Sequence, residues 1–226
     1  MAPKPVRLTE KYRPHRIDDF VGHDKIKAVL SKFIKNPYPN AFLFSGSSGI
    51  AKTAMAIAMA EEVGARRISL GARQANHATI EKLCEEIERD SQYAWNDISP
   101  CNFNRDGVQY RSRLFFVIID EVDQVPETVS YLLLNKLDSS QEVPHTVWIF
   151  TCNSTKNLEK RFLSRCIQLE FSTYGMSPEI VDFLKKVWNA ESGTEHMPDW
   201  ERIVKEKGNN VRDCLQYMEA ELLARS

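Results

Sequence analysis

Several features common in other protein classes are scarce or missing in this 226-residue sequence. No run approaches the ~20 apolar residues that a membrane-spanning helix needs. Neither sign of charge dominates, since 30 Lys and Arg balance 31 Asp and Glu, so any contact with nucleic acid must come from a local basic patch. The cysteines include no C-x-x-C pair, and they are Cys84, Cys101, Cys152, Cys166 and Cys214. Their odd number and irregular spacing argue against a disulfide framework or a zinc module.

The cysteine usage and the polar N-terminus also bear on cellular location. Free thiols are typical of a reducing compartment, and the opening MAPKPVRLTEKYRP is polar where a signal peptide is apolar. We therefore expect a cytoplasmic chain with no membrane association.

Apolar runs alternate with amphipathic segments over the first three quarters of the chain. Helical spacing or composition predicts helices at 23–35, 51–62, 78–90, 126–137 and 157–164. Short apolar runs predict strands at 41–45, 66–70, 114–119, 146–151 and 167–171, while residues 92–112 have the composition of a loop or insertion. Strands that alternate with helices indicate an α/β fold with a parallel sheet covered on both faces.

After about Thr173 the strand signals stop. Ser177-Pro178 is typical of a helix N-cap followed by proline, a second helix is expected from Pro198 to Gly208, and a third carries an apolar stripe from Val211 to Leu222. The length leaves room for one core of ~150 residues and a piece of ~60. We expect a small helical domain behind the α/β core.

A phosphate-binding loop is predicted between the first strand and its helix. The residues are Gly46, Ser47, Ser48, Gly49, Ile50, Ala51, Lys52 and Thr53. In such a loop the backbone N–H groups and the helix N-terminus face a polyphosphate, the lysine reaches the β- and γ-phosphates, and the hydroxyl binds Mg²⁺. An incidental Lys-Thr after a glycine turn is the plainer alternative, which the flanking strand and helix disfavour. Ala51 replaces the last glycine of the pattern and is tolerable if its φ is negative.

A second half of such a site follows the strand at 114–119. Asp120 and Glu121 come directly after it, where open α/β sheets bind ligands. Asp120 would bind Mg²⁺, and Glu121 would orient or deprotonate the attacking water. Two acidic residues after a strand are common, but behind a phosphate loop the pair is more specific.

Further motifs resemble those of a known family. Glu10 to Pro14 read EKYRP and are followed by IDDFVGH, Thr151-Cys152-Asn153 follows a strand, Ser164-Arg165-Cys166 follows a helix, and residues 208–216 read GNNVRDCLQ. In this order, over nearly the whole chain, they resemble the sliding-clamp loader ATPases of the replication factor C type, within the AAA+ superfamily. The resemblance implies a P-loop AAA+ core over residues 1–173 and a helical lid over residues 174–226.

The resemblance assigns a role to each matching residue. Tyr12, Arg13, Val21 and Gly22 would line the adenine pocket, and the loop from Gly46 to Thr53 would hold the phosphates of ATP. Lys52, Glu121, Asn153 and Arg165 would be catalytic, with Thr53 and Asp120 on the metal. Arg165 would reach the ATP of a neighbouring subunit, and Arg212 would approach the γ-phosphate from the lid. Periodicity alone favours solvated positions for both arginines, and the motifs around them reverse that preference.

The sequence also departs from the family pattern. The family usually carries an Ala-Gln-x-Ala-Leu-Arg-Arg helix where residues 129–135 read VSYLLLN, so the glutamine that couples DNA to the active site and both arginines are missing. A third helical domain, the collar, is usual as well, whereas this chain ends at Ser226, soon after residues 208–216, which resemble the family's sensor 2 helix. We therefore expect a short form without a collar, either cut before that domain or naturally short, in which DNA is not coupled to hydrolysis by the usual route.

The resemblance implies partners: other AAA+ subunits in a homo- or hetero-oligomer, a sliding clamp, and primer-template DNA bound through its phosphates. Candidates for DNA contact are Arg73, Gln74 and Asn76 before the helix at 78–90, with added charge from Arg66, Arg67, Arg111 and Arg113. For any one of these arginines a solvated surface position is the simpler interpretation. Two other functions remain open: an ATP-binding regulatory module that hydrolyses poorly, and a loader of another replication component such as a helicase.

Overall fold

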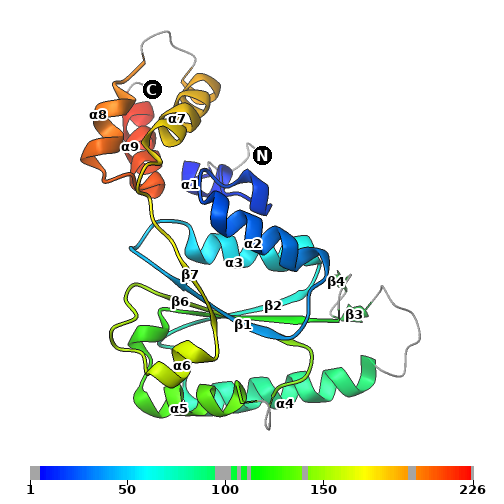
Figure 1. Cartoon of the computed structure of the whole chain (residues 1–226). Coiled ribbons are helices and arrows are strands. Elements are labelled where there is room, and N and C mark those ends of the chain that lie inside the picture. Colours follow the sequence, from blue (N-terminus) through cyan, green and yellow to red (C-terminus); the bar gives the residue numbers. More distant parts are fainter. Residues whose placement is uncertain are drawn as a thin grey trace.

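The computed structural model describes residues 6–94, 103–105, 108–110, 113–138, 142–192 and 197–224. A central sheet lies between two layers of helices, and a separate group of helices sits beyond one of these layers (Figure 1). None of the helices in these ranges is long and apolar enough to cross a membrane.

All five predicted strands are present, and their bounds agree with the predicted ones within one residue. They are β1 (Asn40–Ser45), β2 (Arg66–Gly71), β5 (Phe115–Asp120), β6 (Thr146–Cys152) and β7 (Ile167–Glu170). The order across the sheet is β2-β5-β6-β1-β7, and every pairing is parallel. The predicted α/β fold with a parallel sheet is therefore confirmed.

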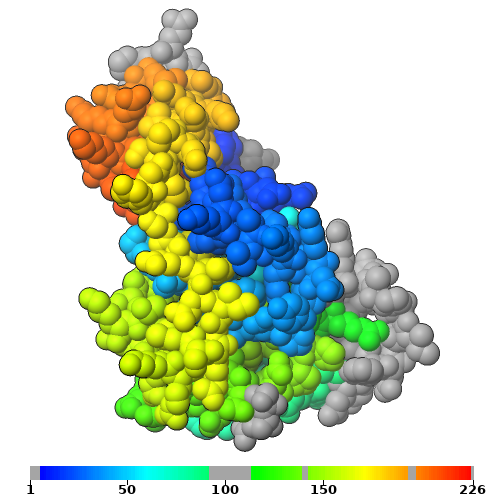
Figure 2. Space-filling view, viewed as in Figure 1, coloured from blue at the N-terminus to red at the C-terminus, as the bar shows by residue number. Residues whose placement is uncertain are grey.

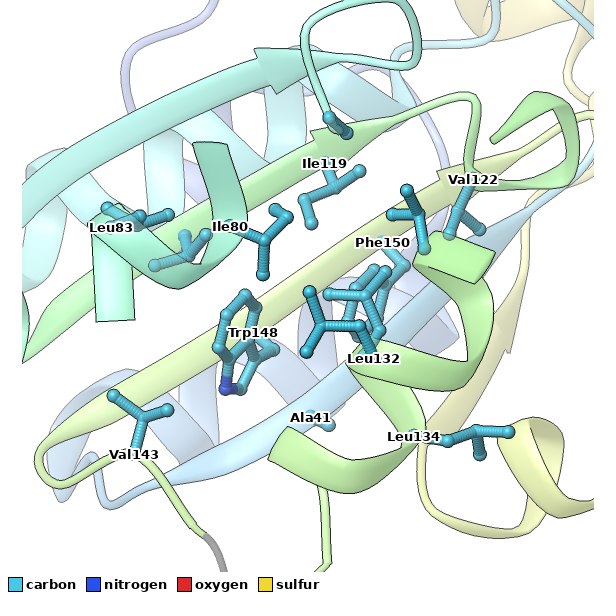
Figure 3. Close-up of a cluster of buried hydrophobic side chains, with 14 of the residues drawn as sticks. Ala41, Ile80, Leu83, Ile119, Val122, Leu132, Leu134, Val143, Trp148 and Phe150 are labelled. Carbon is cyan, nitrogen blue, oxygen red and sulfur yellow. The ribbon is translucent and has the colours of Figure 1, made fainter. Parts of the chain in front are cut away.

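The two faces of the sheet are covered by different helices because side chains alternate along each strand. On β1, Phe42 and Phe44 belong to the cluster covered by α2 (Asp24–Lys35) and α3 (Lys52–Val63). Ala41 and Leu43 belong to the other cluster, under α4 (His77–Ala94) and α5 (Glu127–Lys136). Figure 3 shows the second cluster, where Trp148 and Phe150 of β6 stack with ring centroids 6.0 Å apart.

The segment predicted as a loop at 92–112 is partly regular. Helix α4 continues to Ala94, and β3 (Phe103–Arg105) pairs in antiparallel fashion with β4 (Val108–Tyr110). The short elements η1 (Ile17–Asp19), η2 (Val122–Gln124) and α6 (Lys160–Ser164) connect the larger ones.

After β7 the described residues contain only helices, as expected. They are α7 (Ser177–Glu191), α8 (Trp200–Glu206) and α9 (Val211–Leu223), which we call the lid. The lid has its own apolar core, in which the rings of Trp188 and Trp200 meet edge to face at 5.6 Å. Ser177 is the first residue of α7 rather than its N-cap, which is Met176, and the Ser177 hydroxyl donates to the side chain of Asn209.

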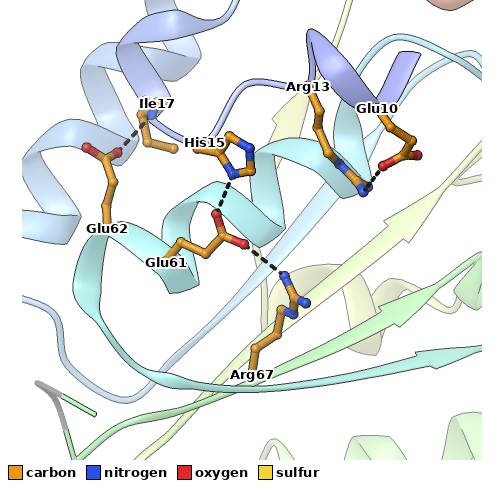
Figure 4. A network of polar contacts seen from close by, with 7 residues as sticks. All are labelled: Glu10, Arg13, His15, Ile17, Glu61, Glu62 and Arg67. Atoms are coloured by element: carbon orange, nitrogen blue, oxygen red, sulfur yellow. Dashed lines mark hydrogen bonds and ion pairs between the residues drawn. The ribbon is translucent and has the colours of Figure 1, made fainter. Parts of the chain in front are cut away.

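The N-terminal segment crosses from the lid to the core. Its first helix, α1 (Leu8–Lys11), buries Leu8 within the apolar cluster of the lid. Further along, His15 contacts Glu61 at 3.0 Å and the backbone N–H of Ile17 donates to Glu62 at 2.8 Å, both near the end of α3 (Figure 4). An exposed ion pair such as His15–Glu61 contributes little to stability. The burial of Leu8 and Ile17 at the two ends of the segment therefore chiefly holds it in place.

Candidate nucleotide-binding site

Three adjacent strands end side by side at one edge of the sheet. β6 lies between β1 and β5, with Ser45 opposite Cys152 and Phe150 opposite Ile119. The loop that follows β1 and the residues at the carboxyl ends of β5 and β6 therefore meet at one place, which is where open parallel sheets bind ligands.

The loop after β1 depends on two glycines. Gly46 has a φ of 140°, and a Cβ there would lie 2.4 Å from the carbonyl oxygen of Phe171. Gly49 has a φ of 80°, and a Cβ there would lie 2.5 Å from the side-chain nitrogen of Asn210 in the lid. Both positions therefore need glycine for conformation and for space.

Ala51 adopts the left-handed conformation, with φ 74° and ψ 10°. We expected alanine to be tolerable here if its φ were negative, and that condition is not met. Ala51 is the N-cap of α3, and its carbonyl accepts the first helical hydrogen bond from Met55 at 2.8 Å. The turn from loop to helix imposes a conformation that costs a non-glycine residue about 1–2 kcal/mol.

Lys52 lies at the floor of the site, with only 8% of the residue exposed. Its ammonium donates to the carbonyl oxygens of Gly46 at 2.6 Å and Ser47 at 2.7 Å, and to Asn153 Oδ1 at 3.2 Å. Burial lowers the pKa of Lys52, while nearby acidic groups, among them Asp120 and Asp123, oppose that shift. A cation held here faces the space that an anionic ligand would fill.

Thr53 and Asp120 form the second polar group. The Thr53 hydroxyl donates to Asp120 Oδ1 at 2.8 Å, and the Thr151 hydroxyl donates to the same oxygen at 2.9 Å. A hydroxyl beside a carboxylate fits Mg²⁺, which prefers oxygen ligands and completes its shell with water and phosphate oxygens. No group of three or more His, Cys, Asp or Glu able to hold a metal occurs among the described residues, so a bound Mg²⁺ would take its remaining ligands from water and a nucleotide.

Glu121 also has a left-handed backbone, with φ 58°, and its side chain is exposed. Its N–H donates to the Thr151 hydroxyl at 3.1 Å. A strained non-glycine residue at the end of a strand is typical of functional sites, where its neighbours hold it in place. Here the strain turns the chain so that Glu121 borders the same cavity as Lys52 and Thr53.

Asp123 was not predicted as a site residue, yet it connects two parts of the site. Its Oδ2 accepts the backbone N–H groups of Asn153 and Ser154, both at 3.3 Å, while its buried Oδ1 has no hydrogen-bond partner among the described residues. It thus fixes the turn that presents Asn153. The sequence offers one weak indication of this role, which is that Asp123 is an acidic residue three positions after Asp120.

These residues enclose a cavity of about 300 Å³ at the boundary between core and lid. Arg212 at the start of α9 borders it from the lid side. Asn210 caps α9 by accepting the N–H groups of Arg212 and Asp213, and it also donates to the Ser48 carbonyl at 3.4 Å. The lid therefore rests directly on the loop. The residues around the cavity are Ser48, Gly49, Ala51, Lys52, Thr53, Ala54, Asp120, Glu121, Thr151, Asn153 and Arg212.

A smaller, apolar cavity of about 80 Å³ lies on the other side of the loop. Tyr12 and Val21, expected at an adenine pocket, border it, together with Ile50 and Ala51 of the loop. Arg13, expected there too, does not border it, and its guanidinium pairs with Glu10 at 3.3 Å. Gly22 lies beside the cavity against the lid, where a Cβ would come within 2.3 Å of Met176 Cε.

Several residues around this cavity were missed from the sequence. They are Pro14, Asp19, Phe20, His23, Thr173, Met176, Phe183, Asn209 and Val211. His23 has a left-handed backbone, and burial lowers its pKa, so the ring stays neutral near pH 7. Phe183 is a partly buried residue of α7 that also packs against the apolar core of the lid.

Arg165 lies away from these two cavities. Its guanidinium donates to Asp138 at 2.8 Å and to the Arg161 carbonyl at 3.2 Å. It borders a cavity of about 210 Å³ together with Asn40 and Thr146, which begin β1 and β6. Since the phosphate loop follows the opposite end of β1, Arg165 does not face its own chain's site.

The candidates for DNA contact differ in their surroundings. Arg73 is exposed before α4, and Asn76 caps that helix by accepting the N–H of Thr79 at 2.9 Å. Arg66 pairs with Asp90 at 2.7 Å and Arg67 with Glu61 at 3.2 Å, so acidic partners offset the charge expected from these two arginines. Arg111 lies outside the described residues.

A parallel sheet, a glycine loop that leads into Lys52 and Thr53, and a carboxylate pair on a neighbouring strand together define a P-loop nucleotide-binding protein. The family model for the "ATPase family associated with various cellular activities (AAA)" matches residues 42–173. The chain therefore belongs to the AAA ATPase family, in its replication factor C-like branch.

The relatives support this branch. The chain is 30% identical over 165 residues to a replication factor C small subunit of Picrophilus torridus, covering 72% of this chain and 48% of that protein. It is 28% identical over 163 residues to the one of Methanocella arvoryzae, covering 72% and 47%. The chain thus spans about half the length of the curated relatives it matches. The resemblance found from the motifs is confirmed.

A solved structure shares the fold. The RuvB Holliday junction branch migration motor of Thermotoga maritima superposes with a TM-score of 0.57 at 18% identity, over 79% of this chain and 54% of that one. At this identity the likeness concerns the fold alone.

Proposed function

We propose that the chain is an ATPase subunit of a DNA sliding-clamp loader, working with ATP and Mg²⁺. One observation carries the proposal: Lys52, Thr53, Asp120, Glu121 and Asn153 meet in one cavity after three adjacent strands. Their order along the chain and their chemistry suit phosphoryl transfer to water. The relatives named replication factor C small subunit direct the proposal toward clamp loading.

In this proposal the two cavities hold different parts of ATP. The apolar cavity takes the base against Tyr12 and Val21, and the loop from Gly46 to Thr53 cradles the phosphates. Lys52 neutralises the phosphate charge, and Thr53 and Asp120 hold the Mg²⁺, which supplies further positive charge at the phosphates.

Three residues would act on the reaction itself. Glu121 orients the attacking water and takes its proton, and Asn153, held by Asp123, contacts that water or the γ-phosphate. Arg212 approaches the γ-phosphate from the lid, so nucleotide binding draws the lid of residues 174–226 onto the core of residues 1–173.

Hydrolysis would require a neighbouring subunit. Arg165 faces away from its own site and would stabilise the transition state in the next subunit, where a guanidinium matches the developing charge. Copies with Arg165→Ala, mixed with copies carrying Lys52→Ala in one oligomer, should recover part of the hydrolysis that each variant lacks alone. Arg161→Ala, which removes an exposed arginine of the same helix, is the control and should need no partner. Failure of the mixture to recover would contradict a role in the neighbouring site.

The other proposed partners are a sliding clamp and primer-template DNA in the cytoplasm. DNA contact through Arg73 and the start of α4 would be directed at phosphates and would weaken steeply with salt. The test is ATP hydrolysis by this chain with its co-purified partner subunits, measured with and without clamp and primed DNA. Stimulation of ATP hydrolysis by clamp and primed DNA together supports a clamp loader. Stimulation by a helicase instead would indicate that the chain loads another replication component.

A second candidate is a regulatory module that binds ATP and hydrolyses it slowly. The left-handed Ala51 favours it, because this residue borders both cavities and its methyl group would crowd phosphates bound in the loop. The family's coupling glutamine and arginines are also absent from residues 129–135. A negligible rate with or without DNA, together with measurable ATP affinity, would select this module.

A further inference from the structure

The N-terminal segment packs into the lid through Leu8 and borders the apolar cavity through Tyr12. Leu8 is 5% exposed and packs in the same apolar cluster as Ile180, Leu184 and Met218 of the lid helices. Figure 1 shows α1 beside α7 and α9, and Figure 2 shows the blue N-terminal residues directly beneath the orange lid. Four residues after Leu8, Tyr12 borders the apolar cavity.

Glu191, the last residue of α7, connects the lid to Lys11 and Tyr12 of the N-terminal segment. One of its carboxylate oxygens accepts a short hydrogen bond from the Tyr12 hydroxyl. The Lys11 ammonium contacts both oxygens, at 2.7 Å and 3.0 Å. Only 17% of the Glu191 side chain is exposed, so this is a partly buried, charge-assisted contact of the stronger kind.

The protonation states keep this contact intact near neutral pH. Burial and the hydrogen bond to Glu191 raise the pKa of Tyr12 to about 12, so the phenol keeps its proton and donates. The hydrogen bonds from Lys11 and Tyr12 lower the pKa of Glu191, so its carboxylate stays charged and accepts.

The contact fixes the orientation of an aromatic wall. The Tyr12 ring meets the Phe183 ring of α7 edge to face at 6.4 Å, and both side chains border the apolar cavity. On the opposite side, Phe20 and His23 of the core border the same space. Without Glu191 the Tyr12 hydroxyl would lose its hydrogen bond to the lid, and the ring would keep only its packing there, which includes the edge contact with Phe183. The residues around the phosphate cavity, which do not include Glu191 or Tyr12, would keep their own contacts.

We propose that Glu191 is a positioning residue for the nucleotide base: it holds Tyr12 as the lid-side wall of the apolar cavity, so that base binding depends on lid position. The inference rests on the proposed function, because it assumes that this cavity receives the base of ATP. The proposal predicts a selective effect, because Glu191 would affect binding of the base and would not affect binding of the phosphates.

The test compares two ligands that share their phosphates. ATP and inorganic tripolyphosphate, each with Mg²⁺, are titrated calorimetrically into the full chain and its variants. Glu191→Ala should weaken ATP about tenfold, the loss of one strong hydrogen bond, and leave tripolyphosphate unchanged. Tyr12→Phe should lower ATP affinity to a similar degree, and the double variant should be no weaker than either single variant.

Two further variants separate positioning from general stability. Glu191→Gln keeps an oxygen that accepts from Tyr12 and should remain within about threefold of the wild type for ATP. Glu206→Ala removes an exposed lid glutamate that pairs with Arg202 and borders neither cavity, and it should change neither affinity.

The outcomes decide between the possible roles. Equal weakening of both ligands by Glu191→Ala would overturn the inference, since it would indicate a structural role for the whole lid. Unchanged ATP affinity in Glu191→Ala and Tyr12→Phe would overturn it too. A wild-type chain that binds tripolyphosphate but gains nothing from the base would overturn the inference and leave the phosphate site in place. A wild-type chain that binds neither ligand would overturn the proposed function itself, and the inference with it.

Discussion

The hydroxyl of Thr53 donates a 2.8 Å hydrogen bond to the carboxylate of Asp120, which joins the start of α3 to the end of β5. The two residues lie 67 positions apart in the chain and meet because β6 brings β1 and β5 into one sheet. Such a pair of oxygens is a ready site for Mg²⁺ once phosphates supply the remaining ligands.

The Thr53 hydroxyl should therefore matter for metal-dependent binding. Thr53→Ala should lower ATP affinity by at least about tenfold when Mg²⁺ is present, and change it little when EDTA removes the metal. Thr53→Ser keeps the hydroxyl and should stay within about threefold of the wild type. Isothermal titration with and without Mg²⁺ measures both effects. An equal loss under the two conditions would show that Thr53 supports the loop rather than the metal.

The strain at Ala51 should be measurable as stability. Ala51→Gly removes a left-handed penalty of about 1–2 kcal/mol, but glycine also adds unfolded-state entropy worth about 0.4–1 kcal/mol. We expect the free energy of unfolding to rise by about 0.5–1 kcal/mol, as measured by urea denaturation. Ala54→Gly inside α3 is the control and should lower it by about 1 kcal/mol. A loss of stability in Ala51→Gly would contradict the left-handed backbone.

The buried thiol of Cys166 should give stability a dependence on alkaline pH. Burial raises its pKa from 9.0 to about 12. Because the folded state keeps a proton that the unfolded chain releases, this contribution is complete below pH 9 and is lost as the pH rises toward 12. Cys166→Ala should reduce the fall in unfolding free energy above pH 9 by about 1.4 kcal/mol per pH unit. Urea denaturation at pH 8 and pH 10 tests this, and identical slopes in both proteins would contradict it.

Local patterns predicted the parts of the site that lie on regular elements. The short apolar run of β1, the glycine loop and the helix after Lys52 follow one another along the chain, so the phosphate loop could be found from spacing. The position of Asp120 followed equally from the buried run of β5, because a carboxylate directly after a parallel strand lies at the ligand edge of the sheet.

Contacts between distant residues could not be predicted in this way. Tyr12 and Glu191 are 179 positions apart, and nothing in the lid helix distinguishes Glu191 from other charged residues at a helix end. The left-handed backbone of Ala51 was missed because the turn from the loop into α3 imposes it, while composition alone is compatible with either sign of φ. Asp123 acts through backbone groups of the turn that follows β6, which residue identity does not reveal.

The most direct test of the account is the comparison of ATP binding and ATP hydrolysis in Glu121→Gln. The substitution keeps the size of the side chain and removes the carboxylate that would take a proton from water, while Lys52 and Thr53 keep their contacts. We predict ATP affinity within about threefold of the wild type and a turnover rate at least about a hundredfold lower. Normal steady-state hydrolysis by this variant would contradict the assignment of the site.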